Sequence, residues 1–149
     1  MGFSLRLSRR FIARRAAFAA ARRGGAAVEF AIIGPVLLLL LSGVITYGGY
    51  FLTAHTVQQL SNDAARAAIA GLDDDERLML ARDAVRNGIA NQAFMRGESQ
   101  VELHRDGSMM RVRVSYDASE DVYWAFEALL PVPRPEISRA ATIRLGGLP

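Results

Sequence analysis

The chain carries one long apolar stretch, which runs from Phe30 to Leu52. Its 23 residues include no charged side chain. As a helix the stretch would be about 34 Å long, enough to cross a hydrocarbon core of roughly 30 Å. The alternative is the buried helix of a soluble domain, but the ~95 residues that follow could hardly enclose a helix that is apolar on every side. The pattern therefore predicts a membrane span.

The pattern beyond the span changes to helical periodicity. One apolar stripe between residues 54 and 70 predicts that the helix continues outside the membrane and stops at Gly71. The members of this stripe are Val57, Leu60, Ala64 and Ala68, with Ala65 and Ile69 alongside.

A second helix is predicted to begin after Asp73. This aspartate can cap the helix, and Glu76 stands at the reciprocal capping position. We prefer this interpretation to a calcium loop, because the acidic run lacks the alternating ligand spacing and the distal glutamate of such loops. The helix is expected to end before Gly97. Its expected core face consists of Leu78, Ala81, Val85, Ile89 and Ala93.

The last third of the chain alternates in the manner of strands. Val101 and Leu103 lead through the turn pair Asp106-Gly107 into a strand over residues 110–116. In that strand Met110, Val112, Val114 and Tyr116 share one face, while Arg111 and Arg113 are predicted to face solvent. Two arginines on one strand are more typical of its wet face than of a nucleic-acid surface.

The remaining segments complete the predicted fold. Residues 122–130 are aromatic and amphipathic, which favours a short helix or a packed loop before the prolines that follow. Apolar positions between Ile137 and Leu145 predict a final strand. The expected fold class is α+β, with a long N-terminal transmembrane helix, a second helix and an antiparallel sheet of about three strands. The expected organisation is a basic leader at 1–24, a transmembrane helix at 25–55 and an extracytoplasmic domain at 56–149.

Charge is distributed unevenly about the span. All eighteen cations are arginine, and seven of them lie in the first 25 residues, which hold no acid. The remainder holds 11 arginines against 15 acids, hence 11 − 15 = −4. Because cytoplasmic flanks carry the excess of cations, the N-terminus is expected in the cytoplasm and the domain outside. A mitochondrial presequence is also arginine-rich and acid-free, whereas the spacing around Arg9-Arg10 does not fit a twin-arginine signal.

Signals for catalysis are missing from the sequence. There is no cysteine, which excludes disulfides, thiolate nucleophiles and cysteine-ligated metals. The two histidines, His55 and His104, have no partner at metal-ligand spacing, and no hydrolase, Walker or dinucleotide motif occurs. We therefore expect no catalytic residue, no metal and no cofactor, and a chain that is the substrate of an enzyme rather than an enzyme.

The junction before the span has a more specific pattern. It reads Arg22-Arg23-Gly24-Gly25-Ala26-Ala27-Val28-Glu29-Phe30, which resembles the prepilin class, whose short basic leader is removed by a membrane aspartyl peptidase after glycine. The resemblance implies cleavage between Gly24 and Gly25, because this bond places Glu29 fifth and Phe30 sixth in the mature chain.

Residues 25–71 are further similar to the TadE-like pseudopilins of the tight-adherence (Flp-type) pilus. The shared features are AAVEFA, Gly34-Pro35, the leucine run 37–41, glycines 43 and 48, and the alanine-arginine helix at 63–68. One departure is the pair Thr46-Tyr47, where family members often carry a second acid, so a second buried charge pair cannot be carried over.

Glu29 would have a physical role in such a subunit. After cleavage Gly25 gains an ammonium group four residues upstream, and the helix N-terminus favours an anion. In a bundle, one subunit's Glu29 can neutralise another's Gly25 ammonium, and both charges are costly in lipid when alone. The alternative is an ordinary interfacial glutamate that stays hydrated.

Two further features of the span have open interpretations. Pro35, after Gly34, predicts a kink or local unwinding, either as a flexible break for extraction from the bilayer or as a tolerated kink. Gly43, Gly48 and Gly49 offer a small-residue face without strict GxxxG spacing.

The resemblance implies a minor pseudopilin or assembly component of the pilus in the bacterial cytoplasmic (inner) membrane. Its implied partners are the prepilin peptidase, other pilin and pseudopilin subunits, the inner-membrane assembly machinery and the lipid bilayer, without nucleic acid. The alternatives are a membrane-tethered extracytoplasmic binding module that keeps its N-terminus, and an imported mitochondrial inner-membrane subunit.

Overall fold

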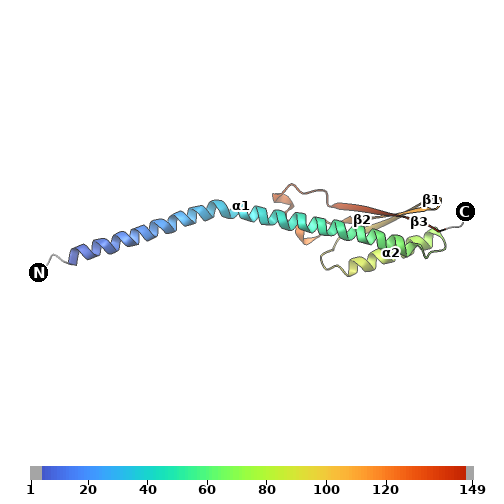
Figure 1. The fold of residues 1–149 in the computed structure, drawn as a ribbon, viewed down its shortest axis with the longest axis horizontal. Helices are drawn as coiled ribbons and strands as arrows, with labels where there is room; N and C mark the ends of the chain where they lie inside the picture. Colours follow the sequence, from blue (N-terminus) through green and yellow to red (C-terminus); the bar gives the residue numbers. More distant parts are fainter. Residues whose placement is uncertain (1–4, 147–149) are drawn as a thin grey trace. The chain divides into compact units, whose positions relative to one another are not determined.

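A computed structural model describes residues 5–146, with the side chains of residues 25–126 and 130–146. The chain forms two compact units, Met1–Leu41 and Ser42–Pro149, and the division falls inside the first helix. Within the described residues the elements in chain order are α1 (Leu5–Ala68), α2 (Asp74–Ala90), β1 (Ser99–Asp106), β2 (Met109–Asp117), the 3₁₀ helix η1 (Val122–Leu129) and β3 (Glu136–Arg144) (Figure 1).

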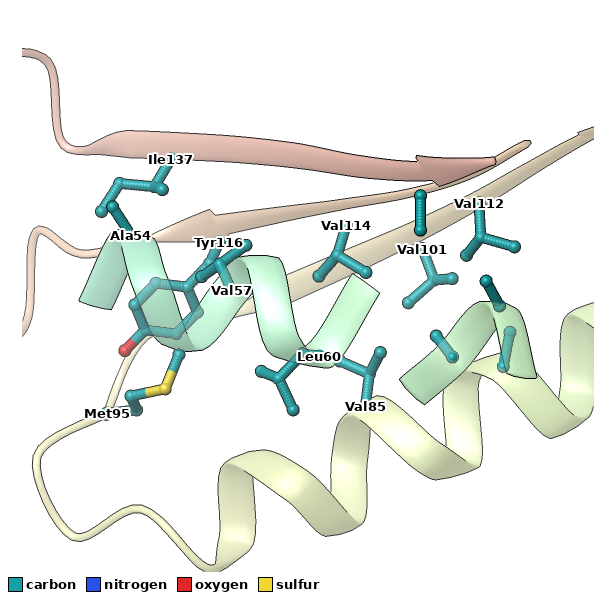
Figure 2. Packing of buried hydrophobic residues seen from close by; sticks show 14 of the residues in the cluster. Ala54, Val57, Leu60, Val85, Met95, Val101, Val112, Val114, Tyr116 and Ile137 are labelled. Atoms are coloured by element: carbon teal, nitrogen blue, oxygen red, sulfur yellow. The ribbon is translucent and has the colours of Figure 1, made fainter. Parts of the chain in front are cut away.

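The second unit has the expected α+β architecture. Its strands form an antiparallel sheet in the order β1-β2-β3, with Val101 opposite Val114 and Val112 opposite Ala141. The C-terminal part of α1 runs along one face of the sheet, and α2 packs beside it (Figure 2). The hydroxyl of Ser61 on α1 donates to the carbonyl oxygen of Arg139 on β3 at 3.2 Å, which fixes the helix against the sheet.

The apolar core lies between these layers. Met110, Val112, Val114 and Tyr116 of β2 are completely buried, and Arg111 and Arg113 are exposed, as the alternation predicts. They meet the stripe of α1 and the buried face of α2, which includes Val85 (Figure 2). Of the expected stripe on α1, Val57, Leu60, Ala64, Ala65 and Ala68 are buried. Ile69 is 52% exposed, because α1 ends at Ala68 and the chain turns away.

The start of α2 confirms its predicted cap. The amide of Glu76 donates to the Asp73 side chain at 2.8 Å, and the Glu76 carboxylate accepts from the amide of Leu72 at 2.8 Å. The predicted end was too late, because the helix stops at Ala90 and Asn91 caps it. Ala93 is therefore outside the helix and exposed, while the following turn carries Met95 into the core.

The hairpin between β1 and β2 is shifted by one residue from its expected position. Asp106 pairs with Met109, so the loop consists of Gly107 and Ser108. Gly107 has φ +56°, and glycine with positive φ at the first loop position is typical of a type II′ turn. The register is therefore set by the position of Gly107 as the first loop residue, where the turn requires a positive φ, and not by a loop formed from Asp106 and Gly107.

Candidate functional site

The expected cleavage bond lies within a helix. Residues 24 and 25 both belong to α1, which is assigned without a break from Leu5 to Ala68. The backbone at Gly24-Gly25 is therefore helical and not extended. Alanines and arginines, both strong helix formers, surround the two glycines and continue the helix through them. A β-carbon at Gly25 would meet no atom within 4 Å, so this position is open on the helix surface.

Glu29 and Phe30 lie on the exposed surface of the first unit. Phe30 is 75% exposed and its ring stands over Gly34, where a β-carbon would lie 3.6 Å from the ring edge. Phe30 therefore covers the glycine before Pro35, and Glu29 is exposed beside it in the sequence. Helical assignment runs through Pro35, so the local unwinding considered above is not found.

The apolar residues of the first unit are uncovered. Every large apolar side chain from Val28 to Leu41 is at least 46% exposed. Among the described residues, α1 supplies one segment long and apolar enough to cross a membrane, within Gly25–Ala68, and only 6% of its most apolar window is buried. This is unlike the core helix of a soluble domain, which its own domain would cover. The helix is a single candidate membrane anchor.

The second half of the apolar stretch behaves differently, because one of its faces packs against the outer domain. Thr46 is completely buried and donates its hydroxyl to the carbonyl oxygen of Tyr123 at 3.2 Å. The Tyr123 hydroxyl in turn donates to the Thr53 hydroxyl at 2.9 Å. These two bonds fasten η1 along two turns of α1.

Gly49 lies between the two threonines and makes the close approach feasible. A β-carbon at this position would stand 2.3 Å from the Tyr123 ring. On the neighbouring side, the hydroxyl of Tyr47 donates to the carbonyl oxygen of Pro131. Thr46 thus holds η1, and Tyr47 holds the segment that follows it.

Sequence interpretation missed this contact, although a signal for it exists. Thr46, Gly49 and Thr53 are spaced three and four residues apart, which places a polar and small stripe on one face of an otherwise apolar helix. Ala54, Val57 and Leu60 continue the same face into the domain core. The packed unit consequently begins at Ser42, earlier than the expected domain start at residue 56.

A buried carboxylate organises the other side of η1. Asp121, which precedes the 3₁₀ helix, accepts from the Tyr116 hydroxyl at 2.7 Å and from the Arg96 amide at 2.9 Å. The Tyr116 hydroxyl accepts from the Gly97 amide at 2.8 Å. Burial, and then the hydrogen bond to Asp121, raises the pKa of Tyr116 to about 12. The network ties the loop after α2 to the start of η1.

The two histidines lie apart from any such cluster. His55 is exposed and its ring shares a hydrogen bond with Gln59, and His104 is exposed on β1. Among the described residues no three His, Asp or Glu side chains gather in a way that could hold a metal ion. An open groove of about 590 Å³ runs beside Gly97, Tyr116 and Arg134 on the domain surface.

Comparison with known protein families gives a match within α1. Residues 24–66 match the family of the TadE-like protein. This range begins at the proposed cleavage bond and ends two residues before the end of α1. Residues 24–66 are TadE-like. No curated protein and no solved structure matches the chain.

The TadE-like segment therefore covers both halves of the apolar stretch. It contains Glu29 and Phe30, the pair Gly34-Pro35, and the stripe from Thr46 to Thr53 that holds η1. The sheet, α2 and η1 lie outside the matched range, so their description rests on the structure alone.

Proposed function

We propose that the chain is a minor pseudopilin or assembly component of a tight-adherence pilus. It is anchored in the bacterial inner membrane with its N-terminus in the cytoplasm. The observation that carries the proposal is the coincidence of the TadE-like match with the exposed part of α1 from Gly25 onward, which presents Glu29 and Phe30. The seven arginines before the span support the orientation.

We propose that a prepilin peptidase removes residues 1–24. Because α1 is helical at Gly24-Gly25, the peptidase has to open one turn of helix, and two adjacent glycines lower the cost of doing so. Cleavage creates the Gly25 ammonium group, which then becomes available to Glu29 of a neighbouring subunit. Pairing removes the cost of two isolated charges in lipid, a few kcal/mol each at the bilayer centre and less toward the interface.

Processing is tested by the mass of the protein purified from its native membrane. The proposal predicts loss of residues 1–24 in the wild type and retention of the leader in Gly24→Leu, because a branched side chain occupies the position that the peptidase requires free. Gly43→Leu, which changes a glycine of the span whose added β-carbon would meet no atom within 4 Å, should still be processed. A wild-type protein of full length would favour the unprocessed binding module instead.

Assembly is tested by Glu29→Gln, which keeps the size of the side chain and removes its charge. We expect normal insertion and leader removal together with a marked loss of pili and of surface attachment. Glu98→Gln, an exposed glutamate of the outer domain, is the matched control and should leave pilus number unchanged. Wild-type piliation in fully processed Glu29→Gln cells would rule out the charge-pairing mechanism.

A further inference from the structure

The position of η1 along α1 is the starting point. Its hydrogen bonds reach Thr46 at one end and Thr53 at the other, a stretch of about 10 Å on a helix with a rise of 1.5 Å per residue. Tyr47, which bonds to the carbonyl of Pro131, extends the contact to the segment that follows η1. The depth of these residues in a membrane therefore fixes the depth of η1.

The length of the span fixes that depth. A hydrocarbon core needs about 20 helical residues, and the head groups add about 5–8 Å on each side. Counted from Gly25, the first residue after the basic leader, 20 residues end at Val44; counted from Phe30, after Glu29, they end at Gly49. The Thr46–Thr53 segment begins just beyond the hydrocarbon in the first case and crosses its outer boundary in the second, and η1 lies beside it.

The composition at this level agrees with an interfacial position. Tyr47 of α1 is 37% exposed at this level, and tyrosine gathers at membrane–water boundaries, whereas Tyr123 and Trp124 are buried in the domain core. Apolar side chains at the same level face outward, with Val122 of η1 63% exposed and Phe51 of α1 66% exposed.

We propose that η1 and the adjoining turns of α1 lie in the outer head-group layer, so that the outer domain is seated on the bilayer by a second apolar contact. The occupant of the exposed side of η1 that carries Val122 is lipid, because η1 packs on residues 46–53 of α1, which belong to or adjoin the charge-free stretch Phe30–Leu52. The inference rests on the membrane topology proposed above. A domain fixed in this way presents its sheet at a constant distance from the membrane.

The chain has no cysteine, which permits single thiols to be placed at will. The full-length protein carrying Val122→Cys, labelled with an environment-sensitive fluorophore, is reconstituted into phosphatidylglycerol–phosphatidylcholine vesicles. Lipids with a nitroxide on the head group or high on the acyl chain should remove most of its fluorescence, and aqueous iodide should remove little. Ala125→Cys, also exposed on η1, should give the same result, and an unchanged Trp124 emission confirms that the labelled domain is folded.

Two control positions separate a failure of the proposed position of η1 from a failure of the proposed membrane topology. Ser108→Cys, in the exposed loop between β1 and β2, should be quenched by iodide and not by lipid, and Leu39→Cys, in the span, should be quenched by lipid. Quenching of Leu39→Cys without quenching of Val122→Cys would overturn the seating of η1 and leave the topology intact. A Val122 label shielded from both quenchers would show that protein covers η1, which also overturns the proposal. Failure of the Leu39 label to meet lipid would overturn the topology and the seating together.

Discussion

The two halves of the apolar stretch both lack charged side chains, but they have different surroundings. From residue 25 to 41 the large apolar side chains are exposed all around the helix, whereas from residue 42 onward one face is buried against η1 and the sheet. The difference comes from a few positions: Thr46, Gly49 and Thr53 supply hydroxyls and space where the first half has leucines. An apolar stretch can therefore be part membrane anchor and part domain core.

The largest effect is expected from a matched pair of leucines. Leu60 of the second unit is 5% exposed, and Leu60→Ala should lower the free energy of unfolding of the outer domain by about 2–5 kcal/mol. Leu40 of the first unit is 60% exposed, and Leu40→Ala should leave it unchanged, because no domain contact is lost. Urea unfolding of the full chain in detergent, followed by Trp124 fluorescence, measures both. Equal losses would show that the halves do not differ as described.

The neighbouring glycines 48 and 49 test whether the contact with the domain is confined to one face of α1. Gly49→Leu forces a side chain against the Tyr123 ring and should destabilise the domain by about 1–3 kcal/mol. Gly48→Leu meets no atom within 4 Å of its β-carbon and should preserve or raise stability by up to about 1 kcal/mol, through helix propensity. The same urea unfolding experiment measures both variants. A Gly49→Leu variant as stable as the wild type would argue against the contact with η1.

The hydroxyl of Tyr116 provides a pH-dependent prediction. Its pKa is raised from 10.0 to about 12 in the folded chain, so the folded state holds the proton more tightly than the unfolded state. The contribution is complete below pH 10 and is lost as the pH rises toward 12. Tyr116→Phe should cost about 1–3 kcal/mol at neutral pH, because Asp121 loses a donor.

The same variant should make the alkaline decline in stability shallower. Tyr123, whose pKa is also raised by burial, would retain part of that decline. Unfolding midpoints measured from neutral pH to pH 12 test this, and a decline as steep as in the wild type would contradict the role of Tyr116.

The smallest effect is expected at the start of α2. Asp74 contacts Arg77 at 3.0 Å and Arg105 at 3.2 Å, and the hydrogen bond to Arg77 foremost lowers its pKa. The contribution is present above pH 3.8 and is lost as the pH falls through the lower folded value. Because the carboxylate is exposed, Asp74→Asn should lower the unfolding midpoint slightly, and high salt should remove the difference. A difference that persists in high salt would require another cause.

Local patterns predicted much of the fold, and long-range contacts could not be predicted in the same way. Alternation identified the buried face of β2, and the Asp73 cap marked the start of α2, because both depend on neighbours a few residues away. The contact of Thr46 with Tyr123 joins residues 77 positions apart, and hydropathy does not distinguish a lipid-facing side from a protein-facing side. The packing of η1 against the apolar stretch was missed for that reason.

The division of the apolar stretch is tested most directly by the coupling between Thr53 and Tyr123, whose hydroxyls are 2.9 Å apart. Unfolding free energies of Thr53→Val, Tyr123→Phe and the double variant, in the full chain in detergent, give the interaction energy of the pair. A buried hydrogen bond predicts a coupling of about 0.5–1.5 kcal/mol. Additive effects of the two substitutions would contradict the packing of η1 on the second half of the stretch, and with it the boundary at Ser42.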